Sequence, residues 1–248
     1  GKEPADMDTN VSPLASKKDK RPLMSGNSKK SAEEIPVRLF DLLIRGELPA
    51  GEESAFEVMG ECWGVSYREL AGETPCDRLA KADLSCLSGS GNWTTLSHLN
   101  RPAVIELMNE DGRRYHVPVV ALDGEAVTVV LKGQEVTVDR FWLDPLWYGD
   151  YTVLWRRPPI EALLLKEGDR GGDVQWLRAK LDLVEGEDPK RTPQPLSPLF
   201  DESLKERVQR FQRNHSVRAD GVVGEQTLIQ LNAASRDPGI PLLTAKAP

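Results

Sequence analysis

The chain has 248 residues, of which 39% are hydrophobic and 29% are charged. This composition is typical of a globular protein with one large or two small domains. The formal net charge is −7 at pH 7 and the sequence pI is about 5.2. The chain therefore lacks the basic field that attracts nucleic acid or anionic lipid, and we expect no nucleic-acid partner.

The sequence contains no obvious membrane-crossing segment. No run approaches the roughly 20 apolar residues that a bilayer-spanning helix needs. The N-terminus also lacks the charged, apolar and small-residue order of a signal peptide. Because the chain begins with Gly1 rather than Met, we expect membrane attachment only through an anchor upstream of it.

Residues 1–34 are rich in Lys, Ser, Asp, Asn and Pro and show no apolar period, which predicts a flexible tail. Apolar residues at helical spacing then predict a helix over 37–44. A second helix is expected from Ser54, where Ser54-Ala55-Phe56-Glu57 has the pattern of a capping box, to a stop at Gly64.

The three cysteines are Cys62, Cys76 and Cys86, and they include no CxxC pair. No cysteine and histidine cluster has zinc-ligand spacing, so we expect no metal and no cofactor. Cys76 and Cys86 flank a short polar stretch, and a disulfide between them would close a small loop in an oxidising compartment. Two reduced, half-buried thiols explain the same spacing, and the residues alone leave both readings open.

Short runs of β-forming residues follow, separated by turn sequences such as Asp123-Gly124 and Lys132-Gly133. We expect strands over 103–107, 116–122, 126–131, 134–138 and 151–155, arranged as an antiparallel meander. The predicted helices precede the sheet and do not alternate with its strands. This order indicates an α+β domain over residues 35–156.

The sequence Arg156-Arg157-Pro158-Pro159 ends the strand pattern and marks the expected domain boundary. Beyond it, a glycine-rich turn precedes a helix that we expect Asp173 to cap. A second helix carries an apolar stripe, and the turn Asp220-Gly221-Val222-Val223-Gly224 leads into a third. Residues 157–238 are therefore predicted to form a small three-helix domain, and residues 239–248 a tail.

Three motifs in this region resemble the peptidoglycan-binding module of bacterial wall hydrolases. They are G-x-R-G-x-x-V-x-x-L from Gly168, the centre Arg210-Phe211-Gln212, and D-G-x-x-G-x-x-T from Asp220. Their glycines and apolar residues identify the fold, so the resemblance implies that exposed polar groups near the two glycine turns contact the wall. The candidates are Arg170, Arg210, Gln212, Asn214 and Asp220, and a surface or turn-capping role explains each of them as well.

Cys62 and His116 supply two members of a cysteine-peptidase constellation. Cys62, however, falls at the predicted C-terminal end of its helix, where the helix dipole disfavours a thiolate. The helix and the His116 hairpin resemble the papain-like bacteriocin-processing peptidases, in which a cysteine opens the helix. Here residues 53–55 hold no cysteine, and residues 130–132 hold no carboxylate where the family has its Asp, the third residue of its site. We expect a degenerate, non-catalytic peptidase domain.

Together, the two domains are similar to the periplasmic half of the general-secretion-pathway A family, the assembly ATPase of type II secretion. Segments that carry this likeness include Gly91-Asn92-Trp93, Arg101-Pro102-Ala103-Val104 and the strand that ends at Trp155. The chain has no G-x-x-x-x-G-K-[ST] phosphate loop, so the ATPase domain of that family is absent from it.

This resemblance implies a periplasmic scaffold that is tethered to the inner membrane in the full-length protein. Its partners would be peptidoglycan, the B-type secretion protein, the secretin and further copies of itself. In the periplasm we predict a Cys76–Cys86 disulfide with Cys62 reduced. The alternative is a peptidoglycan hydrolase or cysteine peptidase that the C-terminal module targets to the wall. A structural envelope or spore-coat protein is a third reading, and it leaves the middle domain unexplained.

Overall fold

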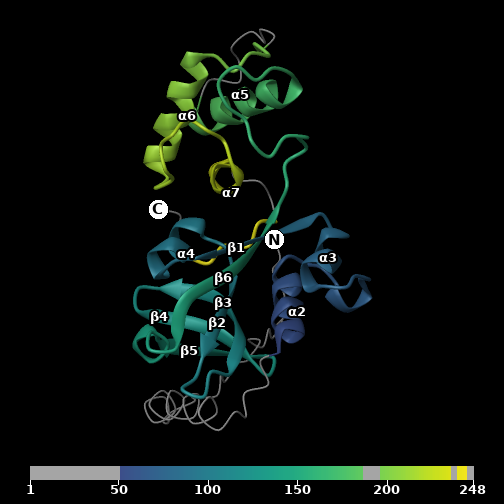
Figure 1. Cartoon of the computed structure of the whole chain (residues 1–248), viewed down its shortest axis with the longest axis vertical. Coiled ribbons are helices and arrows are strands. Elements are labelled where there is room, and N and C mark those ends of the chain that lie inside the picture. The colour runs from purple at the N-terminus through teal and green to yellow at the C-terminus, as the bar shows by residue number, and fades with distance from the viewer. Residues whose placement is uncertain (1–50, 187–195, 236–238, 245–248) are drawn as a thin grey trace, which may run out of the picture.

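The computed structural model describes residues 51–186, 196–235 and 239–244. These residues form a sheet-based domain followed by a helical domain, joined by the long last strand of the sheet and a linker (Figure 1). The expected N-terminal tail and the helix expected over 37–44 lie outside the described residues. The α+β class, with a helix-and-antiparallel-sheet domain before a three-helix domain, is confirmed.

The sheet has six strands in the order β1-β6-β2-β3-β4-β5, and every neighbouring pair is antiparallel. β2 to β5 form the expected meander, whereas β6 returns to pair with both β2 and β1. The bounds are β1 (Leu84–Ser90), β2 (Ala103–Met108), β3 (Arg114–Asp123), β4 (Ala126–Leu131), β5 (Gln134–Asp139) and β6 (Trp147–Arg156).

One strand and two α-helices of the first domain were not predicted: β1, α3 (Pro75–Ala80) and α4 (Trp93–Leu99). α4 lies between β1 and β2, so the expectation that no helix interrupts the strands is wrong. Both short helices begin at capping boxes, in which Thr74 exchanges hydrogen bonds with Asp77, and Asn92 with Thr95. The capping side chains accept hydrogen bonds from backbone amides in the first turn of each helix. Both helices are too short to show an apolar period in the sequence.

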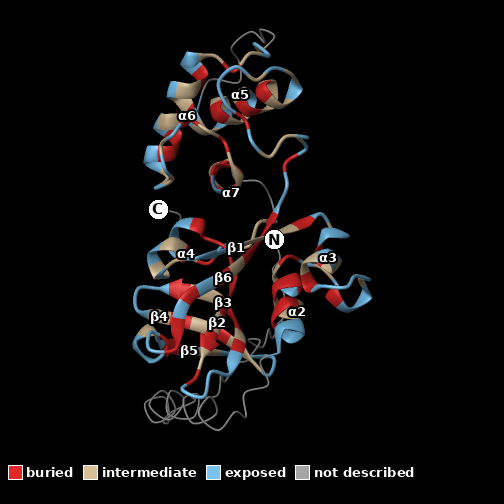
Figure 2. Ribbon diagram, viewed as in Figure 1, coloured by how far each residue is buried: buried red, intermediate tan, exposed pale blue. Residues whose placement is uncertain are grey.

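α2 (Glu52–Cys62) has Gly51 as its N-cap residue, and no side chain caps it. The capping box expected at Ser54 is wrong, because the Ser54 hydroxyl donates to the Gly51 carbonyl at 2.8 Å instead. The helix packs Phe56 and Met59 against one face of the sheet, together with the short η1 helix (Tyr67–Glu69). In Figure 2 the first turn of α2 is exposed, and buried residues follow further along the helix.

The opposite face of the sheet packs against α4. Leu143 and Leu146, which follow the η2 helix (Arg140–Trp142), pack against the same face. Its buried side chains form one continuous apolar cluster with the core of the second domain. That core comes from α5 (Gly172–Glu185), α6 (Glu202–Asn214) and α7 (Glu225–Ala234).

Two expectations about chain ends and caps need correction. Asp173 does not cap α5, since Gly171 occupies the N-cap position, and the Asp173 carboxylate accepts from the Ala162 amide of the linker at 2.9 Å. Residues 239–244, expected as part of a tail, lie against the first domain, and Leu243 is only 1% exposed there. The remaining tail residues, 245–248, lie outside the described part.

Candidate functional site

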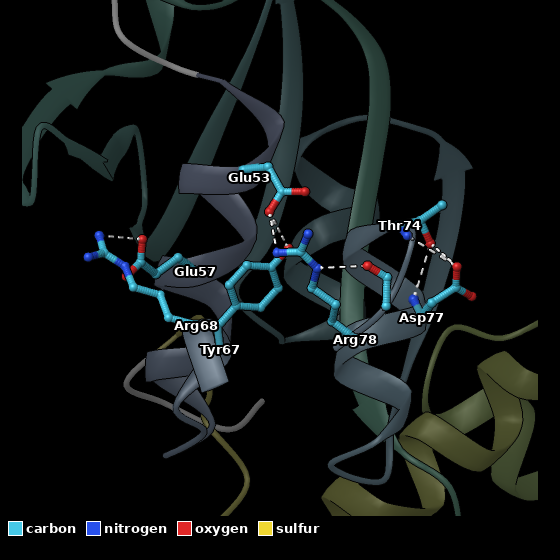
Figure 3. A network of polar contacts seen from close by, with 8 residues as sticks. Glu53, Glu57, Tyr67, Arg68, Thr74, Asp77 and Arg78 are labelled. Carbon is cyan, nitrogen blue, oxygen red and sulfur yellow. Dashed lines mark hydrogen bonds and ion pairs between the residues drawn. The ribbon is translucent and has the colours of Figure 1, made fainter. Parts of the chain in front are cut away.

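The first turn of α2 holds Glu53 in the region where the resembled peptidases carry their cysteine. The Tyr67 hydroxyl donates to Glu53 Oε2 at 2.8 Å, and Arg78 Nη1 donates to the same oxygen at 3.0 Å (Figure 3). Arg78 also donates from Nε to the Gly72 carbonyl at 3.1 Å and lies over the Tyr67 ring, 5.5 Å from its centroid. The network therefore ties α2, η1 and α3 together.

Burial, followed by the hydrogen bond to Glu53, raises the pKa of Tyr67 to about 12. The phenol therefore stays neutral at physiological pH and remains a hydrogen-bond donor to the carboxylate. A second ion pair beside this network, Arg68 with Glu57, completes the polar contacts on this side of α2 (Figure 3). Both interactions are structural links between helices, and neither provides a nucleophile.

Cys62 is the last residue of α2, at the C-terminal end of the helix where the sequence placed it. Burial raises the pKa of its thiol, and the nearby carboxylates of Glu61 and Glu135 add to the effect. Less thiolate is therefore present at a given pH than in a free cysteine, which makes Cys62 a poor nucleophile.

His116 lies on β3, opposite Glu106 on β2, and its Nε2 atom is 3.5 Å from Glu106 Oε2. No hydrogen bond joins His116 to Cys62 among the residues that the structure describes. β4 ends in Val130 and Leu131, and Lys132 follows. The three groups of a cysteine peptidase are therefore not assembled here.

Cys76 and Cys86 are joined by a disulfide, with their Cα atoms 5.9 Å apart. The bond links α3 to the middle of β1, while Cys62 is a free thiol. α3 is thus held both covalently and through the Arg78 contacts described above.

In the second domain, the first glycine turn pairs with the segment that leads into α6. The Gly168 amide donates to the Phe200 carbonyl at 2.9 Å, and the Gly171 amide donates to Pro198 at 3.0 Å. Gly171 has φ = 129°, a conformation that side chains with a Cβ rarely adopt. Arg170 projects from this turn as an exposed residue.

Gln212 organises the second glycine turn from inside the domain. Its Nε2 donates to the Val222 carbonyl at 2.8 Å and to Thr227 Oγ1 at 3.2 Å, while its Oε1 accepts from the Gly221 amide at 2.9 Å. The side chain is fully buried, so in this structure Gln212 presents no exposed group to a ligand. Asp220 Oδ1 accepts a hydrogen bond from the Val222 backbone amide at 2.9 Å. The Asp220 side chain remains partly exposed at the turn.

The two glycine turns lie side by side. Leu165 and Val223 exchange backbone hydrogen bonds of 3.0 and 2.8 Å between them. Lys205 of α6 bridges the turns as well, because its Nζ donates to Glu167 Oε2 at 2.8 Å and its Cγ lies 2.7 Å from where a Cβ on Gly221 would sit. Lys205 and Gln209 therefore belong to the rim of the turns, and the sequence did not identify them.

Arg210 and Asn214 are exposed on α6. Each helical residue is rotated by about 100° from the last, so Arg210 points away from the side on which Gln209 lies near Gly221. The structure thus places Arg170 and Asp220 at the turns, and Arg210 and Asn214 on a separate face of α6.

Two family matches fit these two domains. Residues 49–157 match the family described as GspA, peptidase C39-like domain, and residues 170–231 match the family described as putative peptidoglycan binding domain. The chain is a homologue of general secretion pathway protein A. We call its two parts the C39-like domain and the peptidoglycan-binding domain.

Relatives in two bacteria support this relationship. The chain is 32% identical over 212 residues to general secretion pathway protein A of Aeromonas hydrophila, covering 83% of this chain and 38% of that protein. It is 32% identical over 184 residues to a putative general secretion pathway protein A of Escherichia coli, covering 73% and 35%. The chain thus spans little more than a third of either relative.

Among solved structures, the chain is similar to a periplasmic domain of the EpsAB fusion protein of the Vibrio vulnificus type II secretion system. The TM-score is 0.49 at 24% identity, and the match covers 79% of this chain and 93% of that one.

Within the described ranges, no helix has the length and apolar character needed to cross a membrane. In the same ranges, no group of three or more His, Cys, Asp or Glu residues is placed to hold a metal ion.

Proposed function

We propose that this chain is a non-catalytic, periplasmic scaffold that binds peptidoglycan and helps the type II secretion secretin assemble through the cell wall. One observation carries the proposal: a peptidoglycan-binding domain is joined to a C39-like domain in which Glu53, held by Tyr67 and Arg78, occupies the start of the helix that would bear a nucleophile. The Cys76–Cys86 disulfide is consistent with an oxidising compartment.

Peptidoglycan is contacted, in this proposal, by Arg170 and Asp220 at the two turns and by Arg210 and Asn214 on α6. The wall offers hydroxyls, amides and carboxylates, which exposed guanidinium and amide groups bind through charge-assisted and neutral hydrogen bonds. The apolar residues of the domain are unavailable for this role because they fill its core. Lys205 and Gln209, which adjoin the second turn, extend the same polar rim.

The remaining partners are proposed from the resemblance to the general-secretion-pathway A family rather than from any surface of this chain. The proposal includes the B-type secretion protein, the secretin and self-association on the wall, with the full-length protein tethered to the inner membrane. It also takes the ATPase domain to lie in the part of the full-length protein beyond this chain. A hydrolase or peptidase targeted to the wall is the alternative, and the neutral Cys62 thiol and separate His116 argue against it.

Co-sedimentation with purified peptidoglycan sacculi tests the proposal. Arg170→Ala and Arg210→Ala should each lose one charge-assisted hydrogen bond, worth about 1.5–3 kcal/mol, or roughly 10- to 150-fold in affinity. Circular dichroism should remain unchanged, because surface replacements typically alter stability by about 0.5 kcal/mol or less. The control is Arg113→Ala, which removes an exposed arginine from the C39-like domain.

Equal retention of all four proteins would show that neither arginine contacts the wall. Loss with Arg170→Ala alone would assign the contact to the turns, and loss with Arg210→Ala alone would assign it to α6. Mass spectrometry of the same sacculi distinguishes the alternative function, because a hydrolase or peptidase would release new fragments, whereas a scaffold releases none.

A further inference from the structure

Residues 239–244, which follow α7 of the peptidoglycan-binding domain along the chain, return to the C39-like domain. The Leu243 carbonyl accepts from the Leu122 amide at the end of β3, at 2.8 Å. The Thr244 amide and hydroxyl both donate to Asn100 Oδ1, at 2.8 and 3.0 Å. The segment is therefore hydrogen-bonded to the C39-like domain through both backbone and side-chain groups. Figure 1 shows it crossing that domain near α4 and β1.

Apolar contacts accompany these hydrogen bonds. Leu243 is 1% exposed and belongs to the apolar cluster that includes α4 and the sheet, whereas its neighbour Leu242 is 45% exposed. Ile240 packs against the other cluster, on the side of α2. The segment thus contacts both cores of the C39-like domain, as an extended peptide ligand would.

The same region contains a buried cation between the domains. Arg101 is 1% exposed, and it donates from Nη2 to the Ile229 carbonyl of α7 at 3.3 Å and from Nη1 to the Asn100 carbonyl at 2.9 Å. Burial lowers its pKa to about 10. None of the ion pairs among the described residues involves Arg101, so carbonyl oxygens hold its charge.

Two further hydrogen bonds cross between the domains. The side-chain amide of Asn232 in α7 donates to the Arg156 carbonyl at 3.0 Å, and the side-chain amide of Gln230 donates to the His98 carbonyl. Asn100 connects these contacts to the C-terminal segment, since its backbone carbonyl binds Arg101 and its side chain binds Thr244. A freely tethered domain would not require a buried arginine and an apolar anchor at its junction.

We propose that the C39-like domain has a peptide-docking surface formed by Asn100, the end of β3 and the adjacent apolar clusters. Its occupant is the chain's own segment 239–244, which acts as a strap. The docked strap and the Arg101 junction hold the peptidoglycan-binding domain in one orientation, so that wall binding also orients the C39-like domain. This inference does not depend on which residues contact the wall.

The test compares the whole chain with Leu243→Asp and with the matched control Leu242→Asp, which places the same charge on the neighbouring exposed position. Hydrogen–deuterium exchange at the Leu122 amide reports docking directly. Leu243→Asp should accelerate that exchange by about tenfold or more, and small-angle X-ray scattering should show a larger maximum dimension. The control should match the wild type in both measurements, and sacculi binding should persist in all three proteins.

A chain that ends at Ser235 serves as the second variant, because it removes the strap without placing a charge in a core. It should reproduce the faster Leu122 exchange and the larger dimension while retaining native circular dichroism. Unchanged exchange and scattering in both variants would overturn the proposal. So would unfolding of both, because the segment would then be part of the fold of the C39-like domain rather than a strap that sets orientation.

Discussion

The variant Gln212→Met distinguishes two roles for this residue. The structure places Gln212 in the hydrogen-bond network of the second glycine turn, whereas the sequence suggested that it contacts the wall. Methionine has nearly the same length and fills the same space, but it supplies no strong hydrogen bonds. The replacement leaves the buried Gly221 amide, the Val222 carbonyl and the Thr227 hydroxyl without the partner that Gln212 provides. An unsatisfied buried group costs about 1–3 kcal/mol, and water reaches the part-buried carbonyl, so we expect about 2–4 kcal/mol in total.

Urea unfolding followed by circular dichroism measures this loss. With a denaturant slope of about 2 kcal/mol per molar, the midpoint should fall by about 1–2 M. Gln226→Met is the matched control, since Gln226 is an exposed glutamine on α7 of the same domain. The control should change the free energy of unfolding by about 0.5 kcal/mol or less.

Two results would refute the reasoning. If Gln212→Met and Gln226→Met shift the midpoint equally, the hydrogen-bond network around the second turn contributes little to stability. If Gln212→Met keeps wild-type stability but loses retention on sacculi, Gln212 is a wall contact after all.

Three further predictions concern charge and thiol chemistry. Asp201 caps α6, and its hydrogen bond from the Leu204 amide is the main cause of its lowered pKa. Asp201→Ala should therefore cost about 1 kcal/mol at pH 7, and urea titrations should show the difference vanishing as acid protonates the wild-type carboxylate below its usual pKa near 3.8. Thiol counting in denaturant should find one free thiol before reduction and three after it, whereas three before reduction would exclude the Cys76–Cys86 disulfide. Because burial raises its pKa, Cys62 should react with iodoacetamide more slowly at pH 8 than free cysteine, and Cys62→Ala should leave sacculi uncut, as the wild type does.

The parts of the fold that the sequence predicted well have strong local signals. β4 has the predicted bounds, because alternating apolar residues lie between Asp123-Gly124 and Lys132-Gly133. β1 was missed because four of its seven residues are serine or glycine, and its place beside β6 arises from tertiary pairing.

The candidate site was predicted less completely. The position of Gln212 did have a signal, since it follows Leu204 and Val208 at i+8 and i+4 on the buried side of α6. Its polar character obscured that signal. Lys205 and Gln209 approach Gly221 only through tertiary packing, and the docking of 239–244 similarly depends on a partner surface far away in the sequence.

Hydrogen–deuterium exchange of the whole chain, with and without sacculi, tests most directly the claim that the C-terminal domain binds peptidoglycan. We expect sacculi to slow exchange in the two turns, residues 166–172 and 220–224, and along the exposed side of α6, while β1 to β5 remain unchanged. Slowed exchange confined to residues 51–156, with no change in the C-terminal domain, would contradict the account.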